Sequence, residues 1–310
     1  MIMQGIVYKS TGSWYIIKDG SGNFWNARIK GIFKMDGITS TNPVAVGDIV
    51  DFTLENEGEH SVIITKIHDR VNYINRQSPK VKSQQHIIAA NIDQSLLVAT
   101  LKDPRTSQGF IDRFLVVCEM YHVPAIIAFN KIDLYRQKES DKLEELKQVY
   151  ESIGYKVLAT SLKENKGLQQ VKEILINKTT LISGHSGVGK STLINAILPG
   201  QSIRTQDISG WSGKGQHTTT FAEMYDLPYQ GKIIDTPGMK EFGIVGVEKP
   251  ELSGYFPEMK RRLNNCQFNN CLHINEPGCA IKQAVIDGEI NEDRYVSYYN
   301  ILESIETEWN

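Results

Sequence analysis

The sequence has few cysteines, almost no net charge and no long apolar segment. Four cysteines in 310 residues exclude a disulfide-stabilised scaffold, and a chain of this length forms hydrophobic cores without cross-links. With 34 basic and 36 acidic residues the formal net charge is −2, so bulk charge does not indicate nucleic-acid binding. The sequence has no run of about 18 apolar residues, and its start lacks the apolar core of a signal peptide. We therefore expect a cytoplasmic protein without membrane segments.

The N-terminal region alternates short β-branched and aromatic runs with turn signals. This pattern predicts five strands and an OB-fold-like barrel in residues 1–71, although an SH3-like barrel fits the periodicity equally well. The polar segment 72–89 is expected to act as a linker. The predicted strands cover residues 5–8, 14–18, 23–29, 48–54 and 61–67.

The middle of the chain, residues 90–245, alternates apolar runs with helical patterns. Such alternation predicts a doubly wound α/β domain, in which ligands bind at the carboxyl ends of the strands. The predicted strands cover residues 95–100, 125–129, 156–159, 179–182 and 232–234, and the predicted helices cover 109–121, 141–153, 168–176 and 190–198.

The last region, residues 246–310, is expected to form a mostly helical, zinc-binding domain. We predict helices over residues 250–263, 280–288 and 292–308.

A phosphate-binding loop, the P-loop, follows one predicted strand. Residues 184–191 match G-x-x-x-x-G-K-[ST], whose glycines let backbone N–H groups surround phosphate oxygens at a helix N-terminus. Lys190 is expected to reach the β- and γ-phosphates and to serve catalysis, and Ser191 to ligate Mg²⁺. The candidate phosphate-binding residues are Gly184, His185, Ser186, Gly187, Val188, Gly189, Lys190, Ser191 and the adjacent Thr192.

The sequence N-K-I-D at residues 130–133 favours guanine over adenine. The Asp133 carboxylate can accept hydrogen bonds from both N1–H and the 2-amino group of guanine, a donor pair that adenine lacks. Asn130 is expected to support the base, and the stem of Lys131 to pack on its face. Ser161 and Leu162, at the end of another strand, are expected to add backbone contacts.

Two further segments are expected to sense Mg²⁺ and the γ-phosphate. Asp235 and Gly238 belong to D-T-P-G; the carboxylate fits the Mg²⁺ shell and the glycine N–H fits a γ-phosphate contact. A threonine in residues 213–220 would complete the Mg²⁺ coordination while the γ-phosphate is present. We favour Thr219 over Thr218.

Met239 occupies the position where Ras-like enzymes carry the glutamine that orients the attacking water. Methionine cannot make the required hydrogen bonds, so we expect slow intrinsic hydrolysis unless another residue substitutes. His217 is the nearest candidate, and a contact with a partner or with solvent is the alternative role for this histidine.

Three of the four cysteines lie close together near the C-terminus. Three thiolates and one imidazole favour a closed tetrahedral site for structural Zn²⁺, with free surface cysteines and a redox pair as alternatives. Cys118, in contrast, fits a buried core position. The candidate zinc ligands are Cys266, Cys271, His273 and Cys279.

The order of the motifs is unusual, because Asn130 precedes Gly184, whereas in most GTPases the P-loop comes first. With the G-Q-H-T-T-T stretch and the cysteine spacing, this order resembles the circularly permuted, small-ribosomal-subunit-dependent GTPase family, called RsgA, YjeQ or YloQ. The resemblance covers nearly the whole chain. It implies a GTPase that acts late in small-subunit maturation and is stimulated by that subunit, with a catalytic role for His217.

The expected partners are GTP, GDP and the small ribosomal subunit with its rRNA, with no DNA, no membrane and a monomeric protein. The residues alone leave RNA binding open, because basic runs at 80–82 and 260–262 also fit solvated surfaces. A regulatory GTP-binding scaffold with little turnover remains the alternative, while residues 130–133 oppose an ATP-dependent kinase. We also predict that residues 239–246 report the nucleotide state to the zinc-binding domain.

Overall fold

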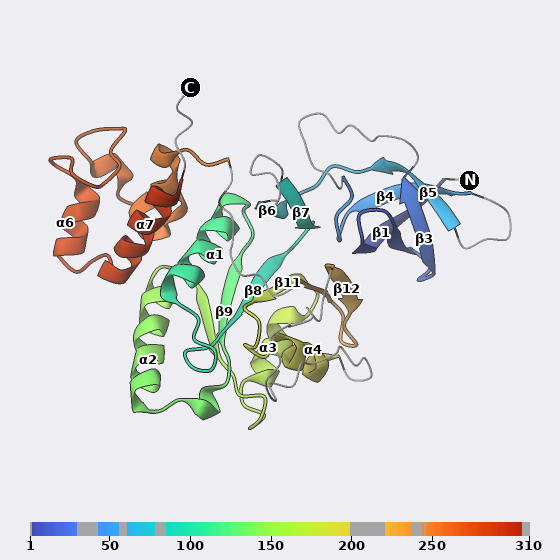
Figure 1. Ribbon diagram of the computed structural model, residues 1–310, viewed down its shortest axis with the longest axis horizontal. Helices are drawn as coiled ribbons and strands as arrows, with labels where there is room; N and C mark the ends of the chain where they lie inside the picture. Colours follow the sequence, from blue (N-terminus) through green and yellow to red (C-terminus); the bar gives the residue numbers. More distant parts are fainter. Residues whose placement is uncertain are drawn as a thin grey trace, which may run out of the picture.

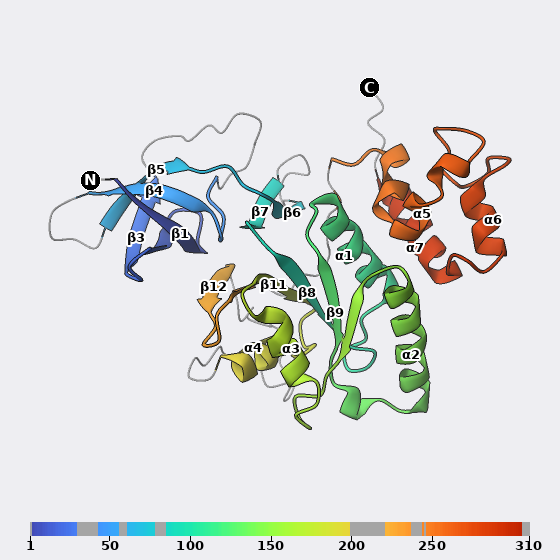
Figure 2. The same ribbon diagram turned by 180° about the vertical axis from the view of Figure 1, so that it is seen from behind.

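The computed structural model describes residues 2–29, 43–55, 61–77, 85–198, 221–236, 244 and 246–305. The N-terminal barrel and the C-terminal helices lie on opposite sides of a central α/β domain (Figures 1 and 2). Among the described helices, none is long and apolar enough to cross a membrane.

The five predicted N-terminal strands are confirmed and form a closed barrel. β1 pairs with both β2 and β4, and β3 runs parallel to β5, which gives the strand order β1-β2-β3-β5-β4-β1. This order is that of an OB-like barrel, and fully buried Val7, Ile17, Phe52 and Ile64 fill its interior. The strands are β1 (Met3–Ser10), β2 (Tyr15–Asp19), β3 (Phe24–Ile29), β4 (Ile49–Leu54) and β5 (Ser61–Ile67).

The central domain contains the predicted parallel sheet, in the order β10-β9-β8-β11-β13. A short antiparallel strand, β12, extends it beside β13, and the sequence analysis did not predict this strand. The strands are β8 (Gln94–Ala99), β9 (Ala125–Phe129), β10 (Lys156–Ala159), β11 (Thr179–Gly184), β12 (Glu223–Asp226) and β13 (Lys232–Asp235).

Helices cover both faces of this sheet, as the predicted doubly wound arrangement requires. Neighbouring residues of β8 point to opposite faces, so Leu97 packs with α1 and α2, whereas Leu96 and Val98 pack with α3 and α4. The helices are α1 (Gln108–Met120), α2 (Gln137–Ser152), α3 (Leu168–Leu175) and α4 (Lys190–Ile197).

Residues 72–89, which were expected to act as a linker, contain two paired strands in the part that the structure describes. β6 (Tyr73–Gln77) and β7 (Gln85–Ala90) pair as a separate antiparallel sheet. Ile74 and Ala89 are buried in the same core as α1, which explains why the two strands are ordered against the central domain. The polar residues between the strands concealed this short apolar pattern.

The C-terminal region is mostly helical, as predicted, but the single helix expected over residues 250–263 is wrong. A 3₁₀ helix, η2 (Lys249–Tyr255), ends before α5 (Pro257–Lys260), and η3 (Leu263–Asn265) follows. Pro257 disfavours helical backbone at the preceding residue, and Phe256 is extended, with φ −109° and ψ 106°. α6 (Ala280–Ile286) and α7 (Glu292–Ser304) complete the part that we call the metal module, residues 246–305.

The barrel contacts the central domain through β12. Lys9 of β1 is the β-bridge partner of Glu223, and their side chains form an ion pair at 3.0 Å. Asp226 accepts hydrogen bonds from the Tyr8 hydroxyl at 2.6 Å and from Lys18 Nζ at 2.5 Å. The described strands of the barrel and of the central sheet therefore form one continuous sheet of eleven strands.

Candidate nucleotide-binding site and metal cluster

The predicted nucleotide-binding motifs meet at one edge of the central sheet. Residues 130–133 follow β9, residues 160–162 follow β10, the P-loop overlaps the end of β11, and Asp235 is the last residue of β13. All four strands are parallel, so their carboxyl ends lie together. Although the motifs occur in a permuted order along the chain, the parallel sheet thus brings them to one place in space.

Glycines in the P-loop are required by the close approach of neighbouring groups. A Cβ at Gly184 would lie 2.5 Å from the carbonyl oxygen of Val98, and one at Gly189 would lie 2.4 Å from Asn130 Nδ2. Gly189 also has φ +94°, a left-handed conformation that glycine adopts without strain. The glycines therefore let the P-loop pack directly against β8 and the N-K-I-D motif.

Lys190 is buried and already paired inside the site. Its Nζ contacts the Asp235 carboxylate and donates to the carbonyl oxygen of Thr236 at 2.5 Å. Thr236 in turn donates to the carbonyl oxygen of Ile182, so the end of β13 is held against β11. The predicted phosphate-binding lysine and the predicted Mg²⁺-shell carboxylate are therefore direct neighbours.

Asn130 connects the predicted base-binding motif to the P-loop. Its Nδ2 donates to the carbonyl oxygen of Val188 at 2.9 Å, and its Oδ1 accepts from Thr160 Oγ1 at 3.0 Å. Asp133 lies in η1 (Ile132–Leu134) and accepts from Ser161 Oγ at 2.6 Å. The carboxylate expected to bind guanine is thus fixed by the segment expected to add further guanine contacts.

The remaining candidates have varied surroundings. The His185 ring stacks on Phe110 of α1, with 3.7 Å between the ring centroids. Thr192 and Ser186 are exposed, and Leu162 packs at the margin of the core under α3 and α4. Three candidates, His217, Thr219 and Gly238, lie outside the described residues, as do Met239 and most of residues 239–246.

Sequence reasoning missed a loop beside the site, residues 100–107, which we call the bracing loop. Lys131 Nζ donates to the carbonyl oxygen of Asp103 at 2.6 Å, and a Cβ at Gly187 would lie 3.5 Å from Pro104. The bracing loop therefore contacts both the base-binding motif and the P-loop. Asp103-Pro104 is a turn signal, but a turn signal does not predict these contacts, which the Asp103 carbonyl oxygen and the Pro104 ring make.

The four predicted metal ligands lie together. The ligand atoms of Cys266, Cys271, His273 and Cys279 are all within 4.8 Å of one another. His273 Nδ1 lies 3.4 Å from Cys279 Sγ and 3.7 Å from Cys266 Sγ. A tetrahedral zinc ion about 2.3 Å from each sulfur and about 2.0 Å from an imidazole nitrogen places nitrogen and sulfur about 3.5 Å apart, so the cluster fits a metal ion such as zinc.

The surrounding structure holds these ligands in place. Tyr295 of α7 donates to the carbonyl oxygen of His273 at 2.6 Å, and Tyr298 donates to that of Leu272 at 2.8 Å. Burial lowers the pKa of His273, which favours the neutral imidazole that binds metal. Burial raises the pKa of Cys271 to about 12, so its thiolate form requires a nearby cation.

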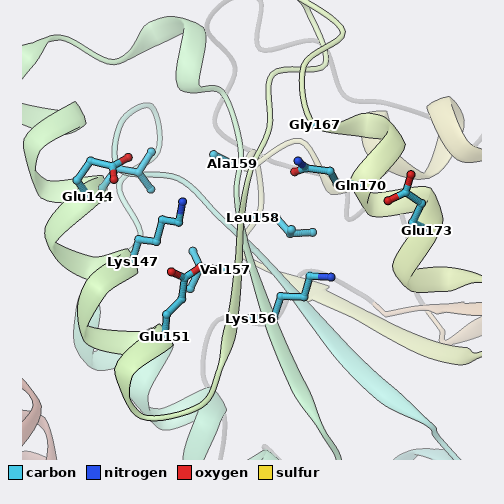
Figure 3. Close-up of a pocket in the computed structure, with 11 residues that line it drawn as sticks. Glu144, Lys147, Glu151, Lys156, Val157, Leu158, Ala159, Gly167, Gln170 and Glu173 are labelled. Carbon is cyan, nitrogen blue, oxygen red and sulfur yellow. The ribbon is translucent and has the colours of Figure 1, made fainter.

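A separate groove of 570 Å³ lies beside β10, the edge strand of the sheet. α2 contributes Glu144, Lys147 and Glu151 on one side, and α3 contributes Gln170 and Glu173 on the other (Figure 3). None of the residues that line this groove belongs to the predicted nucleotide site. Figure 3 therefore shows a cavity distinct from that site.

Comparison with known proteins identifies the family. The sequence model of the RsgA GTPase family matches residues 67–245, more than half of the chain. The chain belongs to this family. The RsgA N-terminal domain matches residues 4–63, which agrees with the observed barrel. The predicted family resemblance is thus confirmed.

Relatives of known name align with nearly the full chain. A Flavobacterium psychrophilum protein named small ribosomal subunit biogenesis GTPase RsgA is 54% identical, over 97% of this chain and 93% of its own. A Christiangramia forsetii protein of the same name is 52% identical, over 98% and 97%.

Two solved structures share the fold. YjeQ from Thermotoga maritima has a TM-score of 0.78 and 32% identity, covering 98% of both chains. YloQ, described as a circularly permuted GTPase, has a TM-score of 0.74 and 30% identity, covering 100% of this chain and 98% of its own. The motif order of the present chain agrees with that description.

Proposed function

We propose that this protein binds GTP with Mg²⁺ and hydrolyses it on the small ribosomal subunit, late in maturation of that subunit. The hydrogen bond from Asn130 to the Val188 carbonyl is the observation that supports this proposal best. It joins a guanine-reading motif to a P-loop although the chain order of the two is inverted. Relatives named for small-subunit biogenesis, at about half identity over nearly the full length, supply the partner.

The phosphates and Mg²⁺ are proposed to rearrange the ion pair between Lys190 and Asp235. Lys190 would contact the β- and γ-phosphates, and Asp235, Ser191 and Thr219 would hold the Mg²⁺, which would supply positive charge next to the phosphates. The two side chains keep each other's charge compensated in the interior until the nucleotide arrives. The N–H of Gly238 is proposed to contact the γ-phosphate.

A single zinc ion is proposed to stabilise the metal module through Cys266, Cys271, His273 and Cys279. A closed set of four ligands leaves no position open for substrate, so the ion has a structural role. Its contribution is to hold a polar loop that buries too little apolar surface to fold on its own.

The subunit is proposed to stimulate hydrolysis, with His217 as the catalytic residue that replaces the missing glutamine. The direct test measures GTP turnover with and without purified small subunits. Stimulation of at least about tenfold supports the proposal. Unchanged slow turnover favours the regulatory GTP-binding scaffold instead.

A second measurement separates the role of His217 from that of the subunit. His217→Ala is expected to retain the affinity for GTP and to lower the stimulated kcat at least about tenfold, because only the transition state loses a contact. An unchanged stimulated rate would remove His217 from catalysis and leave the activation by the subunit intact.

Contacts with rRNA are proposed for the barrel and the metal module, in a monomeric protein of the cytoplasm that uses neither DNA nor a membrane. Trp14 and Phe24 are about half exposed on the barrel, and Lys18 Nζ lies 5.4 Å from the Phe24 ring centroid. Exposed rings beside a cation suit base stacking and phosphate contact. Binding that weakens as salt increases would support such contacts.

A further inference from the structure

The segment that carries Asp133 has little structure of its own. η1 contains only three residues, and it begins after Lys131, whose φ of 60° is left-handed. A 3₁₀ helix of this length is held mainly by its surroundings. The position of the Asp133 carboxylate is therefore determined by contacts from other segments.

Tyr135 provides one of these contacts, two residues beyond Asp133. Its hydroxyl donates to the carbonyl oxygen of Asn130 at 3.0 Å and accepts from the N–H of Leu101 at 2.9 Å. Both partners are backbone atoms, so the phenol ties the two ends of residues 130–135 together and to the bracing loop. Burial raises the pKa of Tyr135 to about 12, and the hydroxyl therefore keeps its proton at neutral pH.

The bracing loop is a firm support for this contact. The N–H of Thr106 donates to the carbonyl oxygen of Thr100 at 2.7 Å, and the N–H of Thr100 donates to Thr106 Oγ1 at 3.1 Å. Thr100 Oγ1 also donates to the carbonyl oxygen of Pro104. Because Pro104 packs beside Gly187, the bracing loop spans the distance from Tyr135 to the P-loop.

We propose that Tyr135 is a positioning residue that sets guanine specificity. It fixes the Asp133 carboxylate relative to the P-loop, and hence to the base of a nucleotide whose phosphates the P-loop holds. This inference rests on the proposed binding of guanine nucleotides at this site. A carboxylate that accepts two hydrogen bonds from one base edge tolerates little displacement, whereas a single hydrogen bond tolerates more.

The substitution Tyr135→Phe tests this role because it removes only the hydroxyl. GDP and IDP are the probes, since the inosine base lacks the 2-amino group and offers Asp133 one hydrogen bond instead of two. The Kd of GDP is expected to increase about tenfold and that of IDP about threefold or less. The preference of the protein for GDP over IDP therefore becomes smaller. Titration calorimetry of both nucleotides measures the ratio.

Tyr155→Phe is the matched control, because it removes a tyrosine hydroxyl that donates to Glu119 Oε1 at 2.9 Å away from the site. It should leave the ratio of the GDP and IDP affinities unchanged.

Equal weakening of GDP binding and IDP binding in Tyr135→Phe, or no weakening of either, would overturn the inference. If this variant fails to fold, Thr106→Val removes a brace of the same loop and should narrow the ratio in the same direction; an unchanged ratio there also overturns it. Failure of the proposed function is distinguishable, because the wild-type protein would then bind ADP as well as GDP.

Discussion

Arg294 of α7 and Asp112 of α1 form a buried ion pair, with 2.7 Å between Nη1 and Oδ1. The two side chains are 1% and 0% exposed. The guanidinium also donates to Glu258 Oε1 at 2.8 Å and to Oε2 at 3.1 Å, and Tyr150 of α2 donates to Asp112 Oδ1 at 2.8 Å. The ion pair therefore connects Arg294 of the metal module to α1, a helix of the central domain that begins beside the P-loop.

Removal of this guanidinium is expected to destabilise the protein strongly. Arg294→Met leaves the carboxylates of Asp112 and Glu258 buried without a cation, which lowers the free energy of unfolding by about 3–5 kcal/mol. Urea denaturation, followed by far-UV circular dichroism, measures the loss.

Lys142→Met is the control, because Lys142 of α2 forms an exposed ion pair with Asp293 of α7 at 3.2 Å. This ion pair joins the same two parts of the protein, but its removal should lower the free energy of unfolding by only about 0–1 kcal/mol, since water screens the pair. Similar losses in the two variants would contradict the importance of burial at Arg294.

The Mg²⁺ dependence of nucleotide binding is expected to depend on Asp235. In the wild-type protein Mg²⁺ should tighten GTP binding at least about tenfold, because a carboxylate joins the metal shell. Asp235→Asn removes the negative charge, so the difference in Kd with Mg²⁺ and with EDTA should fall to about twofold or less. Equilibrium binding of a non-hydrolysable GTP analogue provides both constants, and a full Mg²⁺ effect in the variant would exclude Asp235 from the metal shell.

Metal content should follow the cysteine cluster. The purified wild-type protein is expected to contain about one zinc ion per chain, and Cys271→Ser should lose at least about nine tenths of it, because a hydroxyl is a weaker ligand than a thiolate. Elemental analysis measures the content. Cys118→Ser, in the buried core of the central domain, should retain the metal; loss of zinc in both variants would point to general unfolding.

The contact between the barrel and β12 is expected to weaken in acid. Burial tends to raise the pKa of Asp226, but the hydrogen bonds from Lys18 and Tyr8 lower it below its ordinary value of 3.8. A carboxylate with a lowered folded pKa stabilises the fold fully above its unfolded pKa, and this contribution disappears as pH falls through the folded pKa.

Asp226→Asn should therefore be less stable than the wild-type protein at pH 7, by less than about 1 kcal/mol for a partly exposed pair. The difference should begin to decrease near pH 4 and vanish once the pH lies below the lowered folded pKa of Asp226. Thermal unfolding at a series of pH values measures it. Asp141→Asn, at an exposed position of α2, should show no such pH-dependent difference.

Most of the fold was predictable because its elements carry strong local signals. The apolar runs of β8, β9 and β11 are buried on both faces, and the glycines of the P-loop mark the turn that follows β11. β12 was not predictable, since its four residues bury a single large apolar side chain, that of Met224. The long helix expected over residues 250–263 was wrong because its apolar spacing outweighed the signal of Pro257.

The candidate site divides in the same way. The motif residues around Lys190 and Asp133 were found because their side chains follow a known chemical pattern. Tyr135 and the bracing loop were missed because their contacts go to backbone atoms, which any sequence provides. The buried partner of Arg294 was equally hidden, since Asp112 lies 182 residues earlier in the chain and no local pattern connects the two.

The joint between β1 and β12 has a consequence for the order of folding during synthesis. The barrel strands are complete by residue 67, so this unit can close early. Asp226, which accepts the hydrogen bond of the Tyr8 hydroxyl, lies 218 residues after Tyr8 in the chain. Contacts of such long sequence separation form late because the intervening chain must first be ordered. The contact of the nascent barrel with β12 thus forms only after β12 has left the ribosome, whereas its hydrogen bond from the Ala90 N–H to the Val46 carbonyl oxygen can form earlier. The contacts of the metal module, which carries Arg294, form last.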